Sequence, residues 1–492
     1  MPSLNELSGI EIRDKIRTQE ITAQEVVNSC FNQITAVEDK IHAYTVTYKK
    51  DALKQAKDID KAIKKNRKVG ALAGIPLAVK DLISVKGFQT SAASKMLEGY
   101  KPPYDATVIE RLVRQQDAIF IGTTNMDEFA MGSSTESSYY GPTYNPWNLK
   151  CVPGGSSGGS GAAIAADETI LSLGSDTGGS IRCPAAYCGV AGIKPTYGRV
   201  SRYGVIAYAN SLEQVGPITK TVKDSALILQ NMAGKDPNDS TTVDIEVQEY
   251  LSSIEEGIDG FTIGKPKEFF GDGLNEEVEK QINGAIKELE KKGAEVIDVS
   301  LPHLEYALPT YYLIAMSEAS SNLAKFDGIR YGFTASDKND NVYDAFSKTR
   351  GKGFGPEVRR RIILGTYALS AGYYDQYYIK ALKVRTLIRK DFVKAFQECD
   401  VLIGPTMPST AFEINTKLDD PIQMYLEDIL TVPINLAGIP SMSINCGFTN
   451  EKLPIGLQIM GGFFKESDIF RTAYTLEQEL ELFKKKPEIG GN

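Results

Sequence analysis

The hydrophobic positions of this chain follow two spacings that alternate along its length. Stretches with apolar residues at helical spacing include residues 105–116, 222–232 and 276–292. Short apolar runs of the kind found in buried strands occupy residues 73–79, 118–122, 169–173, 261–266, 294–301, 400–406, 441–446 and 455–460. This alternation of strands and helices predicts an α/β core with a mostly parallel sheet.

Two helix starts are marked by capping residues. Thr22 is followed three positions later by Glu25, a capping box that predicts a helix through residue 34. Thr221 with Asp224 predicts the start of a helix that ends near residue 232. Both starts precede apolar residues at helical spacing, so each marks a helix that packs on the core.

The chain shows no repeat, no low-complexity linker and no clean boundary between domains. Residues 1–70 are expected to form a helical N-terminal layer. Residues 303–398 have few strand signals and many aromatic and arginine residues, which predicts a helical insertion. Residues 236–257 are polar and read as a surface excursion. One domain over residues 1–492 is therefore expected.

Composition narrows the class of protein. Hydrophobic residues make up 42% and charged residues 24%, as is ordinary for soluble globular proteins, and no long uncharged apolar run predicts a membrane helix. The first twenty residues lack an apolar signal core, and the six cysteines are sparse, which favours a reduced, cytoplasmic protein. The net charge of −8 disfavours direct binding of nucleic acid, so we expect any RNA to be handled mainly by a partner chain.

Two glycine–serine turns carry the candidate chemistry. They span residues 154–161 and 177–180, and a short apolar run joins them. Glycine lets the backbone approach a ligand closely, and serines in such turns are candidate nucleophiles. The first turn contains Ser156 and lacks the Gly-Lys-Ser/Thr ending of a phosphate-binding loop, and its glycine spacing does not fit a dinucleotide-binding fingerprint.

The second turn contains Ser180 at a predicted strand-to-helix junction. Its hydroxyl could act as a nucleophile, while the backbone N–H groups of Thr177, Gly178 and Gly179 could stabilise the negative oxygen of a tetrahedral intermediate. An ordinary glycine-rich turn is the alternative interpretation of this segment by itself.

A serine nucleophile needs a base, and histidine is scarce. The chain has only His42 and His303, both far from the two turns. Lys80 ends the predicted strand over residues 73–79, and ligands of α/β sheets collect at strand ends. Lowering a lysine pKa by roughly 3 units, enough for a neutral amine near pH 7, costs about 4 kcal/mol, which burial could supply.

Lys80, Ser156 and Ser180, in this order, resemble the catalytic set of the amidase signature family. The resemblance implies a lysine base, a bridging serine with an unusual cis peptide bond, and a serine nucleophile that attacks a carboxamide. It also implies the fold of that family: a large mixed, mostly parallel central sheet covered by helices on both faces. No metal is expected in the site.

Four further segments resemble one branch of the family, the glutamine-hydrolysing subunits of tRNA-dependent amidotransferases. They are residues 125–135, 194–209, 317–332 and 372–378. The resemblance implies a glutaminase that works in protein biosynthesis within a heterotrimer and has no cofactor of its own. A B subunit would bind the misacylated tRNA, use ATP and Mg²⁺, and receive ammonia to amidate Glu-tRNA(Gln) and, in some members, Asp-tRNA(Asn). A small C subunit would clasp the pair, and no membrane is involved.

Free glutamine carries one charge of each sign, so its pocket needs both. The resemblance suggests Arg360 for the α-carboxylate, Asp428 for the α-amino group and Tyr311 as a neighbour. The sequence leaves alternatives next to each of these residues, namely Arg359 and Arg361, Glu427, and Tyr312.

Other candidates have simpler explanations. Cys183 and Cys188 lack partners for a metal site and are expected to be buried apolar residues. An aromatic series is expected to pack helices or face another subunit; its members are Tyr367, Tyr373, Tyr374, Tyr377 and Tyr378. Two other functions stay open: a free-standing amidase for other carboxamides, with an apolar pocket in place of the charged pair, and a scaffold without catalysis.

Overall fold

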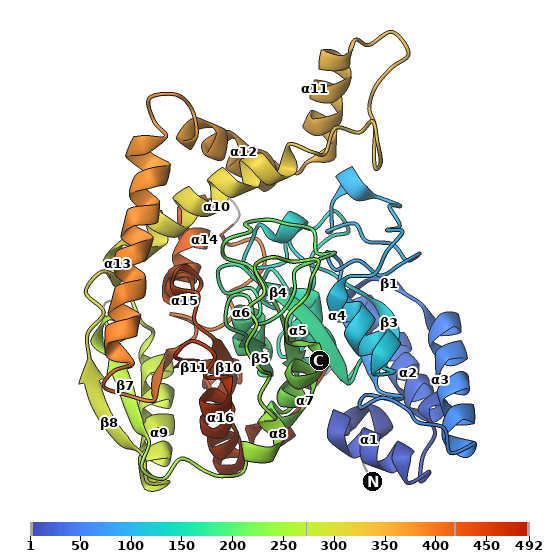
Figure 1. The fold of residues 1–492 in the computed structure, drawn as a ribbon, viewed down its shortest axis with the longest axis vertical. Helices are drawn as coiled ribbons and strands as arrows, with labels where there is room; N and C mark the ends of the chain where they lie inside the picture. The colour runs from blue at the N-terminus through green and yellow to red at the C-terminus, as the bar shows by residue number, and fades with distance from the viewer. Residues whose placement is uncertain (1–2, 272, 418–419, 490–492) are drawn as a thin grey trace.

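Eleven strands form one sheet at the centre of the molecule (Figure 1). The structure, a computed structural model, describes residues 3–271, 273–417 and 420–489. The strand order is β1-β3-β2-β4-β6-β5-β10-β11-β9-β7-β8. The strands are β1 (Tyr44–Thr47), β2 (Pro76–Lys80), β3 (Ile119–Thr124), β4 (Leu171–Asp176), β5 (Ala191–Lys194), β6 (Gln214–Thr219), β7 (Thr262–Pro266), β8 (Glu295–Val299), β9 (Val401–Pro405), β10 (Ser441–Phe448) and β11 (Pro454–Gly461).

The predicted α/β class and the large mixed sheet are confirmed, but the expected predominance of parallel pairing is wrong. Strand β2 runs parallel to β3 and β4, and β7 runs parallel to β8 and β9. The other six pairings are antiparallel. One reason is the short connection between β10 and β11, which permits only an antiparallel hairpin. The other is that β1, β5 and β6, which the apolar pattern did not predict, all pair antiparallel.

Helices pack around this sheet (Figure 1). In chain order they are α1 (Gly9–Arg17), α2 (Ala23–Ile41), α3 (Lys49–Lys64), α4 (Thr107–Ile109), α5 (Gly158–Ala165), α6 (Arg182–Cys188), α7 (Val222–Met232), α8 (Tyr250–Ser253), α9 (Glu276–Lys291), α10 (Ala307–Leu323), α11 (Val342–Gly353), α12 (Pro356–Ala368), α13 (Lys380–Ala395), α14 (Pro421–Leu426), α15 (Val432–Ala437) and α16 (Glu466–Leu480). No helix within the described ranges is both long and apolar enough to span a membrane.

Both predicted helix starts are confirmed. Thr22 and Glu25 form a reciprocal capping box at α2, which extends to Ile41, beyond the predicted end. The Thr221 side chain accepts from the Asp224 N–H at the start of α7. Between Lys64 and the end of β2 the chain leaves the N-terminal helices and enters the sheet, so Lys80 stands at a strand end as predicted.

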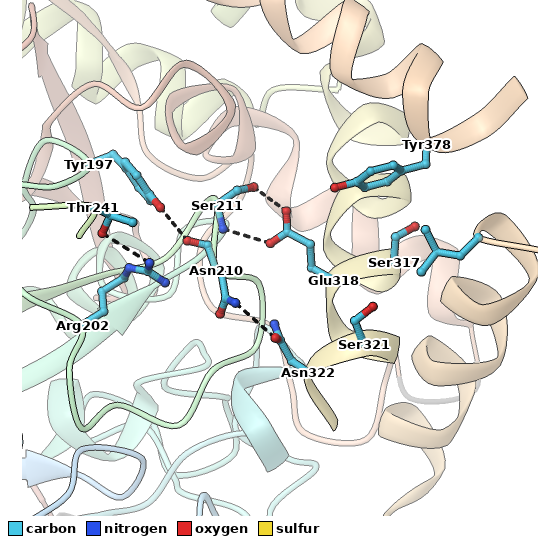
Figure 2. Close-up of a pocket in the computed structure, with 11 residues that line it drawn as sticks. Tyr197, Arg202, Asn210, Ser211, Thr241, Ser317, Glu318, Ser321, Asn322 and Tyr378 are labelled. Carbon is cyan, nitrogen blue, oxygen red and sulfur yellow. Dashed lines mark hydrogen bonds between the residues drawn. The ribbon is translucent and has the colours of Figure 1, made fainter. Parts of the chain in front are cut away.

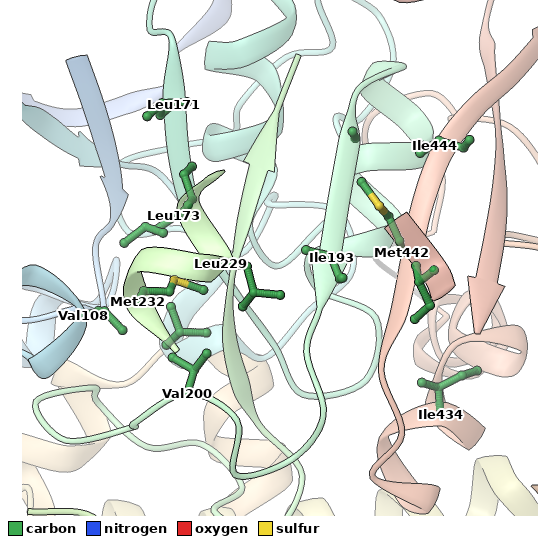
Figure 3. Close-up of a cluster of buried hydrophobic side chains, with 14 of the residues drawn as sticks. Val108, Leu171, Leu173, Ile193, Val200, Leu229, Met232, Ile434, Met442 and Ile444 are labelled. Atoms are coloured by element: carbon green, nitrogen blue, oxygen red, sulfur yellow. The ribbon is translucent and has the colours of Figure 1, made fainter. Parts of the chain in front are cut away.

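Helices cover both faces of the central strands. On one face, strand glycines allow α6 to approach closely: a Cβ on Gly192 would lie 2.9 Å from Ala185, and one on Gly456 would lie 2.3 Å from Ala186. The opposite face is apolar. Figure 3 shows part of this second layer, a cluster of buried side chains from the sheet, from α7 and from neighbouring segments. Among them are Leu171, Leu173, Ile193, Leu229 and Met442.

Candidate active site

The two glycine–serine turns lie side by side at one edge of the sheet. One connects β4 to α6 and carries Ser180; the other leads into α5 and carries Ser156. The backbone N–H of Ser157 donates to the Ser180 carbonyl over 3.2 Å, which ties the turns together. The peptide bond between Gly155 and Ser156 is cis.

Lys80 reaches this edge because β2 is the parallel neighbour of β4. Its Nζ atom is 2.7 Å from Ser156 Oγ and 2.9 Å from Ser175 Oγ. The side chain has no exposed surface. Burial lowers the pKa of Lys80 from its ordinary 10.5 to about 7, although Asp127, among nearby carboxylates, opposes the shift. An amine that is half neutral at pH 7 can accept a proton, which is the property that a base for serine needs.

Ser180 is 7% exposed, whereas Ser156 is fully buried. Within the described part of the chain, their hydroxyls share no direct hydrogen bond, and the link between them is the backbone contact of the two turns. Ser180 is therefore the serine that a substrate can reach. Ser156 stands behind it, in contact with the amine.

The backbone N–H groups proposed to stabilise an oxyanion differ in whether they already have a hydrogen-bond partner. The Gly179 N–H already donates to Asp176 Oδ1 over 2.8 Å. A Cβ on Gly178 would lie 2.5 Å from the Tyr311 hydroxyl, and one on Gly179 would lie 2.5 Å from Thr431 Oγ1. Glycine is thus required at both positions, because neighbouring side chains close tightly over the turn.

A buried ion pair, which was not predicted from the sequence, supports this turn. Arg182 binds both carboxylate oxygens of Asp176, each over 3.0 Å, and both side chains are fully buried. Burial raises the Asp176 pKa, but the Arg182 guanidinium outweighs this effect and lowers it to about 2. The guanidinium also donates to the Asn435 and Gln458 side chains and to the Thr431 carbonyl. The sequence did contain a clue to this ion pair, because Asp176 and Arg182 are opposite charges on either side of the glycine-rich turn.

A cavity of about 360 Å³ adjoins the turn of Ser156. Its walls come from residues 127–137 and from α12, together with Lys417, Pro421, Met424 and Tyr425. Asp127 links the cavity to this turn: a Cβ on Gly155 would lie 2.2 Å from its carboxylate. The cavity therefore adjoins the turn that carries Ser156, although neither Ser156 nor Ser180 is among its lining residues.

The charged residues predicted for glutamine lie around this cavity. Arg360 and Arg361 both line it, while the Arg359 guanidinium donates to the Gly351 carbonyl. Arg361 is buried, and its guanidinium donates to Glu357 and to the Tyr208 hydroxyl, over 2.7 Å each. The Arg360 side chain is 41% exposed and pairs with Glu357. Arg360 is therefore the more accessible of the two lining arginines.

Asp428 and the tyrosine pair are also brought together. Asp428 accepts hydrogen bonds from Ser133, which lines the cavity, and from Tyr312, each over 2.7 Å. Burial raises the pKa of Asp428 to about 6. Glu427, the alternative acid, turns away to pair with Lys417 and Tyr187. The two tyrosines divide their contacts: Tyr312 holds Asp428, and Tyr311 covers the glycine turn.

A second hollow, of about 550 Å³, lies between α10 and the loop before β6 (Figure 2). Its polar side chains bind one another: the Ser211 N–H and hydroxyl donate to Glu318 over 2.9 and 2.6 Å, and Asn210 donates to Asn322 over 3.1 Å. These bonds hold the loop on α10, the helix that carries Tyr311. These hydrogen bonds thus help to position Tyr311 in the candidate site.

The remaining candidates lie outside the candidate site. Cys183 and Cys188 are buried free thiols, as expected. The predicted aromatic series forms ring contacts with centroids 4.5 to 6.1 Å apart at the bend between α12 and α13. Across residues 3–271, 273–417 and 420–489, no three His, Cys, Asp or Glu side chains gather in a metal-binding group.

Comparisons with known proteins identify the family of this chain. The A subunit of glutamyl-tRNA(Gln) amidotransferase from Halothermothrix orenii is 54% identical, over 99% of this chain and 100% of that protein. The same protein from Bacillus velezensis is 53% identical, over 97% and 98% of the two chains. The crystal structure of the corresponding A subunit from Thermotoga maritima superimposes with a TM-score of 0.82 at 38% identity, covering 99% of each chain. The family model described as Amidase matches residues 25–470, and the chain therefore belongs to the amidase family.

Proposed function

We propose that this chain is the glutamine-hydrolysing subunit of a tRNA-dependent amidotransferase. The relatives named above, matched over nearly their full length, carry the name of such a subunit. The observation that carries the proposal is the contact of 2.7 Å between a fully buried lysine amine and Ser156 Oγ, beside the turn of Ser180.

The chemistry follows from the proton acceptor. Neutral Lys80 takes a proton from Ser156, Ser156 takes one from Ser180, and Ser180 Oγ forms a bond to the carboxamide carbon. The carbonyl π electrons move to the oxygen, which the N–H groups of the second turn stabilise, with Thr177, Gly178 and Gly179 as the proposed donors. The Gly179 N–H would have to leave Asp176 to take part.

The tetrahedral intermediate then collapses. The carbon–nitrogen bond breaks, the proton returns through Ser156 to the leaving nitrogen, and ammonia departs, leaving an ester of Ser180 with the glutamyl group. Water, deprotonated through the same pair, attacks this ester and releases glutamate. As the ester bond breaks, the proton taken from water returns through Ser156 to Ser180 Oγ, so Lys80 ends each cycle neutral.

The walls of the cavity suit a free amino acid. We propose that Arg360 binds the α-carboxylate, that Asp428 binds the α-amino group, and that Tyr311 packs beside the substrate. Arg361, engaged by Glu357 and the Tyr208 hydroxyl, would hold the first turns of α12. A free-standing amidase for aryl or fatty amides would need an apolar pocket for the acyl group. The charged residues Arg360 and Asp428 suit free glutamine better than such a group.

The chain's acidic character supports a division of labour within an assembly. We propose that partner chains, the B and C subunits, complete the enzyme, that the B subunit binds misacylated tRNA, ATP and Mg²⁺, and that this chain holds no cofactor. We further propose that the complex works in the cytoplasm and that residues 1–492 form one domain, since strands from both halves of the chain pair in one sheet.

The direct test is ammonia release from glutamine by the chain alone and by the complex with its co-purified partners. We expect release that is lost in Ser180→Ala. Undiminished release by that variant would show that another group is the nucleophile. Efficient turnover of apolar amides by the chain alone, unaffected by partners, would favour a free-standing amidase.

A further inference from the structure

Glu128 is a buried carboxylate that lies at the junction of three segments and has no part in the chemistry above. It follows Asp127, which lines the cavity, and it is 3% exposed. Its Oε1 atom accepts from Ser94 Oγ over 2.5 Å, and its Oε2 atom accepts from the Gly355 N–H over 2.8 Å. Gly355 is the N-cap residue of α12, directly before its first residue.

The identity of Gly355 depends on this contact. Its φ of −69° and ψ of 170° are values that any residue adopts, so the backbone conformation does not require glycine. A Cβ at this position would, however, lie 2.2 Å from Glu128 Oε2. The carboxylate therefore approaches the start of the helix more closely than any side chain at residue 355 would permit.

The helix held in this way forms one wall of the cavity. Pro356, Glu357 and Arg360 lie in its first two turns and line the cavity together with residues 127–137. Further along, α12 crosses α10 so closely that a Cβ on Gly365 would lie 1.9 Å from the Met316 carbonyl oxygen (Figure 1). The crossing fixes the middle of α12. At the start of the helix, the Glu128 contact with Gly355 adds to the hydrogen bonds of Arg361 with Glu357 and the Tyr208 hydroxyl.

The two acidic neighbours therefore hold opposite parts of the same cavity. Asp127 packs against Gly155 in the turn of Ser156, and Glu128 packs against Gly355 at the start of α12. Asp127 and Glu128 are adjacent in the chain. Their two contacts therefore link the turn of Ser156 to the first turns of α12 through one short segment.

We propose that Glu128 is a positioning residue for glutamine: its carboxylate fixes the first turns of α12, and with them Arg360, at the distance from Ser180 that the substrate requires. The inference rests on the proposed glutaminase function. It assigns Glu128 no contact with substrate; its effect passes through α12.

The test compares variants in the assembled complex, with KM and kcat for glutamine measured by ammonia release. We expect Glu128→Ala to raise KM at least about tenfold while kcat changes less than about threefold. Glu128→Gln keeps an acceptor for Gly355 and a polar partner for Ser94, so its KM should stay within about threefold of wild type. Gly355→Ala, which displaces the carboxylate without removing it, should raise KM as Glu128→Ala does.

Glu477 supplies a matched control. Like Glu128, it is a buried glutamate that accepts a hydrogen bond from a backbone N–H at the start of a helix. Glu477 lies in α16, and its donor is the N–H of Val222 at the start of α7, over 2.7 Å. Glu477→Ala should lower the midpoint of urea unfolding and leave the KM for glutamine unchanged. This control separates loss of a helix anchor in general from loss of the anchor of α12.

Two further measurements separate positioning from general damage. Propionamide lacks the α-carboxylate and the α-amino group, so its kcat/KM should be equal in wild type and Glu128→Ala. In the double variant Glu128→Ala/Arg360→Ala, KM should rise little beyond that of Arg360→Ala, because one residue acts through the other.

An unchanged KM in Glu128→Ala, an equal loss with propionamide, or additive effects in the double variant would each overturn the inference. A wild-type complex that releases no ammonia from glutamine would overturn the proposed function and this inference with it. Ammonia release by the wild type together with a normal KM in both Glu128→Ala and Gly355→Ala would overturn the inference alone.

Discussion

Lowering the pH from 8 to 6 should protonate Lys80 and slow glutamine hydrolysis. With a pKa of about 7, the neutral fraction of the amine is about 0.9 at pH 8, about 0.5 at pH 7 and about 0.1 at pH 6. Because only the neutral amine accepts a proton, kcat/KM should fall about tenfold across this interval, and the slope of log kcat/KM against pH should approach one below pH 6. The assay is ammonia release from glutamine by the assembled complex between pH 5.5 and 9.

The same shift also makes the stability depend on pH. In the unfolded chain the amine keeps a pKa near 10.5, so between about pH 7 and 10.5 the unfolded state binds one more proton than the folded state. The free energy of unfolding therefore rises with pH in this window, and at pH 7 the buried amine costs about 4 kcal/mol.

Lys80→Met should remove that cost together with two serine contacts worth about 1 kcal/mol each. We expect the variant to be inactive, about 2 kcal/mol more stable at pH 7 in urea unfolding, and less dependent on pH above 7. A rate profile that is flat from pH 6 to 8, or a Lys80→Met protein that is less stable than wild type at pH 7, would refute the reasoning that burial makes this lysine a base.

Three other substitutions probe separate parts of the site. Lys80→Ala should abolish ammonia release from glutamine but leave ammonium-dependent amidation by the complex intact, since external ammonia bypasses the site; loss of both activities would assign the lysine a structural role. Arg360→Ala should raise the KM for glutamine about tenfold or more with little change in kcat, and a fall in kcat at constant KM would contradict substrate binding. Arg182→Met leaves Asp176 charged and buried, so it should lower the free energy of unfolding by about 3 to 5 kcal/mol in urea titrations, and a change below about 1 kcal/mol would show that the pair is dispensable.

The sequence predicted helix starts and strands where the residues of one short segment were sufficient to indicate them. The capping residues at Thr22 and Thr221 predicted two helix starts, because the hydrogen bonds involved join residues three positions apart. Strand β2 was predicted from its unbroken apolar run. Strand β5 was missed because it has only four residues, and β6 because Gly216 and Pro217 interrupt its apolar pattern; neighbouring strands supply the hydrogen bonds that form both.

The candidate site was predictable in its residue types and only partly in its geometry. The two serine turns and the strand-end lysine stood out because glycine spacing and strand ends are local features. The choice among Arg359, Arg360 and Arg361 was not available, since consecutive helical residues point in different directions and the packing of α12 decides which faces the cavity. The Glu128 contact with Gly355 joins residues 227 positions apart, and no feature of the sequence near either residue predicts it.

By itself the sequence indicated the alternation of strands and helices, two helix starts, the serine turns and the membership of the amidase family that those turns indicate. Tertiary structure decided which groups became chemically competent. Lys80 is a candidate base only because β2, β4 and the two turns exclude water from its amine, and desolvation is a sum over neighbours that are distant in the chain. Spacing along the chain reports local geometry, whereas a pKa and the width of a pocket depend on what the whole fold packs around them.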